Sequence, residues 1–420
     1  MNIIIKKLKT SGFFLVFGSN VLNKIISFSS GIILVRLLSK SEYGLYSYAL
    51  NIMSMFLLVN GMGTNTGMMQ FGSENFKDKP EVGDAYFRFG TWIGIVFNII
   101  LTVAIVLYSF LFEPSIKNAN VLLLLMSGIP MAAFILESIQ IYHRANANNK
   151  AFAILNTTNT ILVFSFTILG AYILKVYGIV CFNYFAYSIT ILMGLKLSKV
   201  ISKLKNSKYN LKKIEKTRFL KFSLIATFNN GISQLLYIID VFLIGVFIGD
   251  TNLIATYKTA TLIPFALNFI PYSIAVYIYP YFASRNQDKK WIRKNYCDIL
   301  KYLGLFNVVV SGFLFICAPF IIYTIFGEQY SDSLLAFRLL AIGYFFSGTF
   351  RIITGNIIVM IRKVNFNFYL SLVMGGINII LDIYMIKNYG ITGAAVATLT
   401  VIILNSAIST IYLLNWTRSK

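Results

Sequence analysis

Charged residues are scarce in this sequence. Only 12% of the 420 residues are Asp, Glu, Lys or Arg, whereas soluble domains carry roughly 25%. Hydrophobic residues make up 57% of the chain, and the mean hydropathy is +0.72. A water-soluble fold cannot bury this much apolar surface, so the composition excludes one and indicates an integral membrane protein.

Cysteine and histidine are almost absent. The three cysteines, Cys181, Cys297 and Cys317, have no CxxC or metal-ligand spacing. The pattern therefore implies neither a disulfide framework nor a zinc site, and we expect no cofactor. The only histidine, His143, stands beside Arg144 at the end of an apolar run. We interpret it as an interfacial polar residue, with a proton relay as the alternative.

The excess of positive charge does not indicate a nucleic-acid-binding protein. The net charge is +22, with 37 basic and 15 acidic residues. Binding to nucleic acid requires basic residues gathered on a folded polar surface. Here they stand between apolar runs, so membrane topology explains them and no nucleic acid partner is expected.

Long apolar runs fill the rest of the chain. A span needs about 20 mostly apolar residues, and the runs predict an all-α integral membrane fold of about twelve helices. We expect them near residues 12–35, 43–71, 85–112, 119–142, 151–174, 178–200, 219–247, 252–283, 299–325, 333–361, 365–386 and 390–416.

The distribution of lysine and arginine predicts the orientation, because these residues resist translocation in short loops. If the N-terminus is cytoplasmic, 28 of the 37 basic residues fall in cytoplasmic segments, five in outer segments and four within helices. We therefore predict that both termini lie in the cytoplasm.

The chain divides into two similar halves. The polar segment 202–218 predicts a basic cytoplasmic linker between an N-terminal lobe, 1–201, and a C-terminal lobe, 219–420, of six helices each. KVYGI at 175–179 recurs as KNYGI at 387–391. An even number of helices per lobe gives both lobes the same orientation, as in parallel repeats that enclose a central cavity.

Ionisable residues inside predicted spans are the candidate site residues. A charge at mid-helix costs roughly 2.5–3.5 kcal/mol and usually faces a bundle interior or a wet cavity. Because lysine and arginine bind phosphate groups, we assign Lys24, Arg338 and Arg351 to an anionic ligand. Glu137 and Asp382 could bind a coupling cation or pair with arginines.

A further pair of charges lies on neighbouring predicted helices. Asp240 and Lys258 are 10 and 8 residues from the turn near Asp250, which places them at similar depth. We predict an ion pair, either a structural bridge or a gate that opens when substrate competes. Arg36, at the outer end of the first helix, either guards the cavity mouth or extends to the interface.

Three segments carry a resemblance to a known family. They are NVLNKIISFSSGIILVRLLSKSEYGLYSYAL at 20–50, FGEQY at 326–330 and YGITGAAVAT at 389–398. Together they make the chain similar, over nearly its whole length, to the polysaccharide transporter family, the Wzx-type O-antigen and capsule flippases. This family belongs to the multidrug/oligosaccharidyl-lipid/polysaccharide (MOP) superfamily.

The resemblance implies a MATE-like fold, with two six-helix lobes around a cationic central cavity. It implies alternating access that carries undecaprenyl-pyrophosphate-linked oligosaccharide from the inner to the outer leaflet of the bacterial cytoplasmic membrane. The implied partners are this substrate, membrane lipids, a polysaccharide polymerase and a chain-length regulator. The cationic cavity maps onto Lys24, Lys258, Arg338 and Arg351. Polar residues that could line it are Asn20, Asn23, Asn51, Asn60, Thr64, Asn65, Asn156, Thr157, Thr158 and Asn159.

Two rival functions stay open. A multidrug cation antiporter would favour acidic residues deep in the bundle, but four basic residues stand against three acidic ones within the predicted spans. A membrane polymerase or glycosyltransferase would need catalytic groups outside the bilayer or a nucleotide-sugar site. The predicted outer loops are short and carry no P-loop, so we expect a transporter rather than an enzyme.

Overall fold

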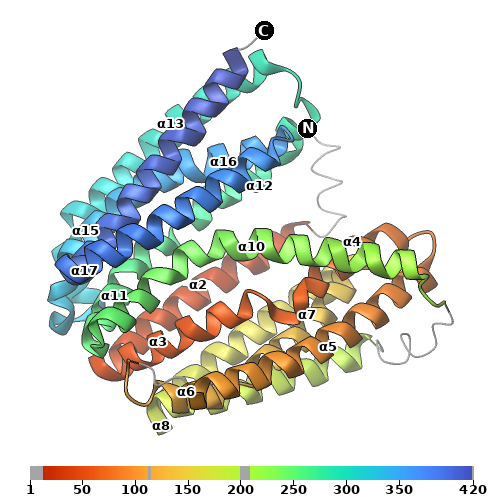
Figure 1. Ribbon diagram of the computed structural model, residues 1–420, viewed down its shortest axis with the longest axis horizontal. Coiled ribbons are helices and arrows are strands. Elements are labelled where there is room, and N and C mark those ends of the chain that lie inside the picture. Colours follow the sequence, from red (N-terminus) through yellow and green to blue (C-terminus); the bar gives the residue numbers. More distant parts are fainter. Residues whose placement is uncertain (1–12, 112–114, 199–208, 419–420) are drawn as a thin grey trace. The chain divides into compact units, whose positions relative to one another are not determined.

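The computed structural model describes residues 13–111, 115–198 and 209–418, and these form helices without any strand (Figure 1). The main helices are α2 (Phe13–Leu37), α3 (Lys40–Leu57), α4 (Thr64–Asn75), α5 (Pro80–Leu111), α6 (Ala119–Met126), α7 (Ile129–Ala145), α8 (Asn149–Ser198), α10 (Lys213–Ile248), α11 (Thr251–Ala266), α12 (Phe269–Ser284), α13 (Lys289–Ile316), α15 (Leu334–Phe346), α16 (Ile352–Met360) and α17 (Val364–Arg418). Shorter elements are η1 (Asn60–Gly63), α14 (Ala318–Ile321), η2 (Ile322–Phe326), η3 (Glu328–Ser333) and η4 (Ser347–Arg351).

These helices supply twelve spans. Nine segments within the described residues are long and apolar enough to cross a membrane. Two of them are double, because α8 and α17 contain 50 and 55 residues and are broken at Leu174–Lys175 and at Gly390. The 36-residue helix α10 contains a shorter apolar stretch, Ile238–Ile248, and we count it as the twelfth span. The predicted all-α membrane fold is therefore confirmed.

Contacts divide the chain into two units, Met1–Gly231 and Ile232–Lys420. The spans from α2 to α8 belong to the first unit, and those from α11 to α17 to the second. Helix α10 begins in the first unit and ends in the second. This division falls within α10, after the predicted linker at 202–218, of which 202–208 lie outside the described residues.

The start of α3 explains the Arg-Leu-Leu-Ser motif, residues 36–39, within the segment 20–50 that resembles the polysaccharide transporters. Ser39 is the N-cap: its Oγ accepts a hydrogen bond from the Glu42 N–H at 3.2 Å, and Glu42 Oε2 accepts one from the Ser39 N–H at 2.9 Å. This reciprocal pair satisfies backbone donors that a helix start leaves without partners. The motif therefore ends one span and begins the next.

The single span predicted at 43–71 is wrong in one respect, because η1 interrupts it. Gly61 and Gly63 have φ angles of 56° and 68° there, which glycine adopts without a steric penalty. A Cβ on Gly63 would also meet Thr227 and the Ser223 backbone of α10. The break thus lets the chain approach α10 closely. The hydropathy pattern missed it because the apolar run continues through the glycines.

The repeated KxYGI segments lie at the two hairpin turns, but they do not turn at equivalent residues. The left-handed residue of the first turn is Lys175, with φ 53° and ψ −137°. The second turn has the same conformation at Gly390, with φ 58° and ψ −139°. In the sequence alignment Lys175 matches Lys387, so the turn is three residues later in the second repeat. Across the first turn, Thr167 Oγ1 donates to Asn183 Oδ1 at 3.0 Å, which joins the two arms of α8.

Close helix packing at the α8 hairpin gives a stability prediction. A Cβ on Gly178 would overlap the backbone carbonyl of Gly170 on the facing arm. We expect Gly178→Ala to destabilise the protein by about 1–3 kcal/mol, because two packed backbones must separate. Thermal unfolding in detergent measures this. Gly312→Ala is the matched control, since nothing lies within 4 Å of its Cβ position; equal melting temperatures for both variants would contradict the packing argument.

Candidate functional site

Two buried aspartates lie at the centre of a polar cluster in the second unit. Asp240 of α10 and Asp382 of α17 are 2% and 0% exposed. Asp240 Oδ2 accepts hydrogen bonds from Tyr257 OH at 2.5 Å and from Thr398 Oγ1 at 2.6 Å. Asp382 Oδ2 accepts one from Asn378 Nδ2 at 2.7 Å. The two carboxyl groups also interact with each other, so α10, α11 and α17 bring five polar side chains to one place. We call these five residues the carboxyl cluster.

The charge of the cluster limits what it can bind. The Oδ1 atoms of Asp240 and Asp382 are buried without a hydrogen-bond donor among the described residues. Two neighbouring carboxylates away from water repel each other unless a proton or a cation is shared between them. Half-buried Lys258 of α11 interacts electrostatically with Asp240 and offsets one charge. One negative charge remains, which suits a single proton or a monovalent cation.

The ligand atoms that the carboxyl cluster offers are those that bind a hard cation rather than a transition metal. Carboxylate, amide and hydroxyl oxygens are the ligands that hard cations prefer. Over the ranges that the structure describes, no group of three or more His, Cys, Asp or Glu side chains is placed to hold a metal. The carboxyl cluster could therefore hold a monovalent cation or a proton.

Two charged residues of the first unit are exposed near the middle of their helices, unlike the buried carboxyl cluster of the second unit. Lys24 lies near the middle of α2, and Glu137 lies near the middle of α7; both side chains are exposed. A charge facing the hydrocarbon centre costs roughly 2.5–3.5 kcal/mol, so such side chains face water or a polar ligand. We therefore infer that these two residues mark a hydrated surface in the first unit.

Hydrogen bonds fix the neighbours of these two charges. Glu137 Oε2 accepts a hydrogen bond from Asn65 Nδ2 of α4 at 2.7 Å, and Ser138 Oγ donates to Asn65 Oδ1 at 2.9 Å. Asn20 lies one helical turn before Lys24, and its Oδ1 accepts a hydrogen bond from Asn156 Nδ2 of α8 at 3.4 Å. Glu137 thus accepts a hydrogen bond from an amide, and a pair of amide side chains lies one helical turn from Lys24.

The polar residues expected to line a cavity fall into two sets. Asn23, Asn51, Thr64 and Asn65 are buried by protein. In contrast, Asn20 is exposed, and Asn60 of η1 and residues 156–159 of α8 are half-buried. The accessible members of this set therefore come mainly from α2 and α8, which pack against each other.

The remaining predicted residues lie elsewhere. Arg338 of α15 is half-buried; its Nε donates to the Phe315 carbonyl at 3.3 Å, and its guanidinium lies 5.4 Å from the Phe315 ring centroid. Arg351 is half-buried at the end of the π-helical turn η4 and already interacts with its surroundings. Arg36 is exposed in the last turn of α2. His143 is only 5% exposed at the end of α7, so protein encloses it.

The carboxyl cluster and the neighbouring Lys258 make six residues, of which the sequence analysis named three and missed three. Asp240, Lys258 and Asp382 were expected inside the membrane, but Tyr257, Asn378 and Thr398 were not. Asn378 precedes Asp382 by four residues, which places both on one helix face, so this partner could have been found. Thr398 is 158 residues from Asp240. No local pattern connects residues so far apart.

The fold is one that membrane transporters share. An inward-facing MATE family multidrug transporter of the MOP superfamily superposes with a TM-score of 0.75 at 15% identity, over 94% of each chain. The lipid II flippase MurJ, in an inward closed conformation, gives 0.75 at 18% identity, over 97% of this chain and 88% of its own. A MOP superfamily transporter from Pyrococcus furiosus gives 0.63 at 15% identity, over 96% and 92%. The chain is thus a multi-pass membrane protein with the two-lobe, MATE-like fold.

The sequence shows the family. Residues 33–335 match the model of the polysaccharide biosynthesis protein family, and the chain belongs to this family. No curated protein matches the chain in a sequence comparison. This match and the fold bear out the resemblance to a family of polysaccharide biosynthesis proteins with a MATE-like fold.

Proposed function

We propose that this protein is a flippase for undecaprenyl-pyrophosphate-linked oligosaccharide repeat units. It moves them from the inner to the outer leaflet of the bacterial cytoplasmic membrane for O-antigen, capsular or exopolysaccharide synthesis, and both its termini are cytoplasmic. The observation that carries the proposal is a polysaccharide biosynthesis sequence on a transporter fold, one that MurJ, named as a lipid II flippase, also has. A polymerase and a chain-length regulator are its expected partners.

The first unit supplies groups that suit such a substrate. Lys24 offers a point charge to the pyrophosphate. Glu137 and the Asn20–Asn156 pair offer acceptors and donors to sugar hydroxyls. The lipid tail can stay in the bilayer, so only the polar headgroup needs this surface. In the second unit, half-buried Arg351 stays a candidate for the anionic headgroup, whereas the Arg338 guanidinium already contacts Phe315.

The carboxyl cluster supplies a means of coupling. A proton or monovalent cation held by Asp240 and Asp382 would join α10 to α17, and its release would leave two like charges in contact. Binding there therefore biases the arrangement of three helices, which is what coupling to transport requires. Lys258 interacts with the same carboxylate, so it competes with the cation, and the Asp240–Lys258 pair would then act as a gate.

Deleting the gene tests the proposed function. We expect complete lipid-linked repeat units to accumulate in the cytoplasmic leaflet and surface polysaccharide to disappear, because the headgroup cannot cross hydrocarbon unaided. Accessibility of the repeat unit to an impermeant sugar-oxidising reagent in intact spheroplasts measures the leaflet. Unchanged surface polysaccharide in a strain without a redundant transporter would refute the proposal.

A multidrug cation antiporter is the second candidate, because MATE family multidrug transporters share the fold and two buried carboxylates could attract cations. The exposed Lys24 at mid-span would repel an organic cation. We therefore expect expression to leave the susceptibility of a drug-sensitive host to cationic dyes unchanged. A clear rise in resistance would favour the antiporter.

A further inference from the structure

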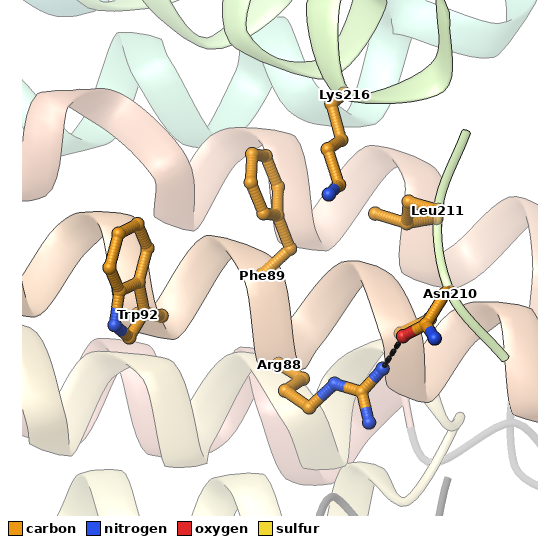
Figure 2. A pocket seen from close by; sticks show the side chains of 7 residues that line it. Arg88, Phe89, Trp92, Asn210, Leu211 and Lys216 are labelled. Carbon is orange, nitrogen blue, oxygen red and sulfur yellow. Dashed lines mark hydrogen bonds between the residues drawn. The ribbon is translucent and has the colours of Figure 1, made fainter. Parts of the chain in front are cut away.

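A small pocket lies at the junction of α5 with the start of α10. Its volume is about 230 Å³, and both elements belong to the first unit. Figure 2 shows the pocket with Arg88, Phe89 and Trp92 on α5, and with Asn210, Leu211 and Lys216 on the segment that leads into α10 and on its first turn. Neither the carboxyl cluster nor the hydrated surface around Lys24 and Glu137 includes these residues.

Two positive groups from separate elements flank the pocket. One Arg88 nitrogen, Nη2, donates to Asn210 Oδ1 at 3.0 Å (Figure 2). The same nitrogen donates to the Tyr209 carbonyl at 2.8 Å. These bonds fix the guanidinium and tie the segment before α10 to α5. The Lys216 ammonium lies 5.5 Å from the Phe89 ring centroid. An anion placed between them would meet a planar guanidinium and a point charge.

The nearest acidic residue on the α10 side has partners of its own. Glu215 accepts hydrogen bonds from Tyr209 OH at 3.1 Å and from the Lys212 N–H at 2.6 Å. Burial and the Glu215 carboxylate raise the pKa of Tyr209, which keeps this phenol neutral as a donor. The Glu215 charge is outnumbered on this segment by Lys212, Lys213, Lys216 and Arg218, so the α10 side of the pocket stays positive.

An apolar stripe runs along α5 from the pocket. Trp92, which lines the pocket, is 62% exposed. Exposed large hydrophobic residues continue from it at helical spacing, namely Val96, Ile99, Ile100, Val103, Leu107, Phe110 and Leu111. Residues three and four apart lie on one face of a helix. A molecule in the pocket thus has a polar end beside Arg88 and Lys216 and a long apolar surface on the same helix.

We propose that this pocket binds the phosphate of an anionic membrane phospholipid whose acyl chains lie along the α5 stripe. Basic pockets between transmembrane helices on the cytoplasmic side bind such headgroups, and tryptophan is typical of the membrane interface. Free phosphate shares the headgroup chemistry but would gain nothing from the stripe. The pocket lies among residues that we place on the cytoplasmic side. The proposal concerns a structural lipid and does not depend on which substrate is flipped.

Quenching of Trp92 fluorescence tests the proposal directly. The chain has three tryptophans, so a variant with Trp291→Phe and Trp416→Phe leaves Trp92 as the only reporter. We compare vesicles that contain equal fractions of dibrominated phosphatidylglycerol or dibrominated phosphatidylcholine. We expect the anionic lipid to quench Trp92 at least about twofold more strongly, because bound lipid keeps its bromine atoms near the indole. Equal quenching by the two lipids overturns the proposal.

Matched variants separate a site from general surface charge. Arg88→Gln with Lys216→Gln should abolish the preference, whereas Arg88→Lys with Lys216→Arg should retain it. Lys290→Gln with Lys294→Gln removes the same charge from exposed residues of α13 and should also retain it. Loss of the preference in this control would mean nonspecific attraction and would overturn the proposal.

A competition with phosphate and a fallback measurement complete the quenching experiment. Millimolar inorganic phosphate should leave the preference intact; if it removes the preference, the pocket is a site for free anions and the lipid proposal is wrong. If the double Trp→Phe background does not fold, the difference in quenching between the unmodified protein and Trp92→Phe gives the same quantity. Because none of these measurements involves flipping, their failure would leave the proposed function untouched.

Discussion

Asp382→Asn is expected to abolish transport while the protein still inserts and folds. Asparagine keeps the shape of the side chain but carries no charge, so the carboxyl cluster loses the group that shares a proton or cation with Asp240. A buried charge that loses its oppositely charged partner typically loses about 3–5 kcal/mol. A cation in the cluster loses one carboxylate in this variant, so its affinity should fall at least about a hundredfold. The measurement is export of lipid-linked repeat units in cells or in vesicles that contain the purified protein.

Two variants serve as comparisons for this prediction. Asp298→Asn makes the same chemical change at an exposed position of α13 and should transport normally. Thr398→Val removes one hydrogen bond to Asp240 and should reduce transport by about ten- to a hundredfold without abolishing it, since a hydrogen bond to a charged group contributes roughly 1.5–3 kcal/mol. If Asp382→Asn transports at the normal rate, the cluster is structural and takes no part in coupling.

Most of the fold could be predicted from the sequence, because membrane spans depend on a simple physical rule. A helix must cover the hydrocarbon core with apolar residues, and each predicted run corresponds to a span in the structure. The breaks within spans could not be predicted. The η1 break depends on how closely α4 approaches α10 at Gly63. The turn lies at Lys175 in the first repeat and three residues later, at Gly390, in the second. This shift depends on how each hairpin packs, and a hydropathy pattern cannot predict it.

The site was predictable only as a set of charges. Ionisable residues inside apolar runs stand out because they are costly there, and this identified Asp240, Lys258, Asp382, Lys24 and Glu137. Their surroundings depend on tertiary packing. Asp240 and Asp382 are buried with hydroxyl and amide donors, whereas Lys24 and Glu137 are exposed. Sequence alone therefore could not separate the proposed site for a small cation from the proposed surface for a large polar headgroup.

Lys24→Gln is expected to reduce transport by about ten- to a hundredfold with little effect on stability. The side chain is exposed near the middle of α2, so replacing it should change the free energy of unfolding by no more than about 0.5 kcal/mol. A charge-assisted hydrogen bond to a pyrophosphate contributes roughly 1.5–3 kcal/mol, and that contribution is lost in the glutamine variant. Export of lipid-linked repeat units gives the rate, and thermal unfolding in detergent gives the stability.

Lys24→Arg separates the charge from the size of the side chain. Arginine keeps the positive charge and can bind phosphate through two parallel hydrogen bonds, so this variant should keep most of the transport. Lys150→Gln, which neutralises an exposed lysine at the start of α8, should leave transport unchanged. Because Lys24 belongs to the first unit and Asp382 to the second, raising the cation concentration should not rescue Lys24→Gln. Full rescue by cation would assign Lys24 to coupling instead of to substrate binding.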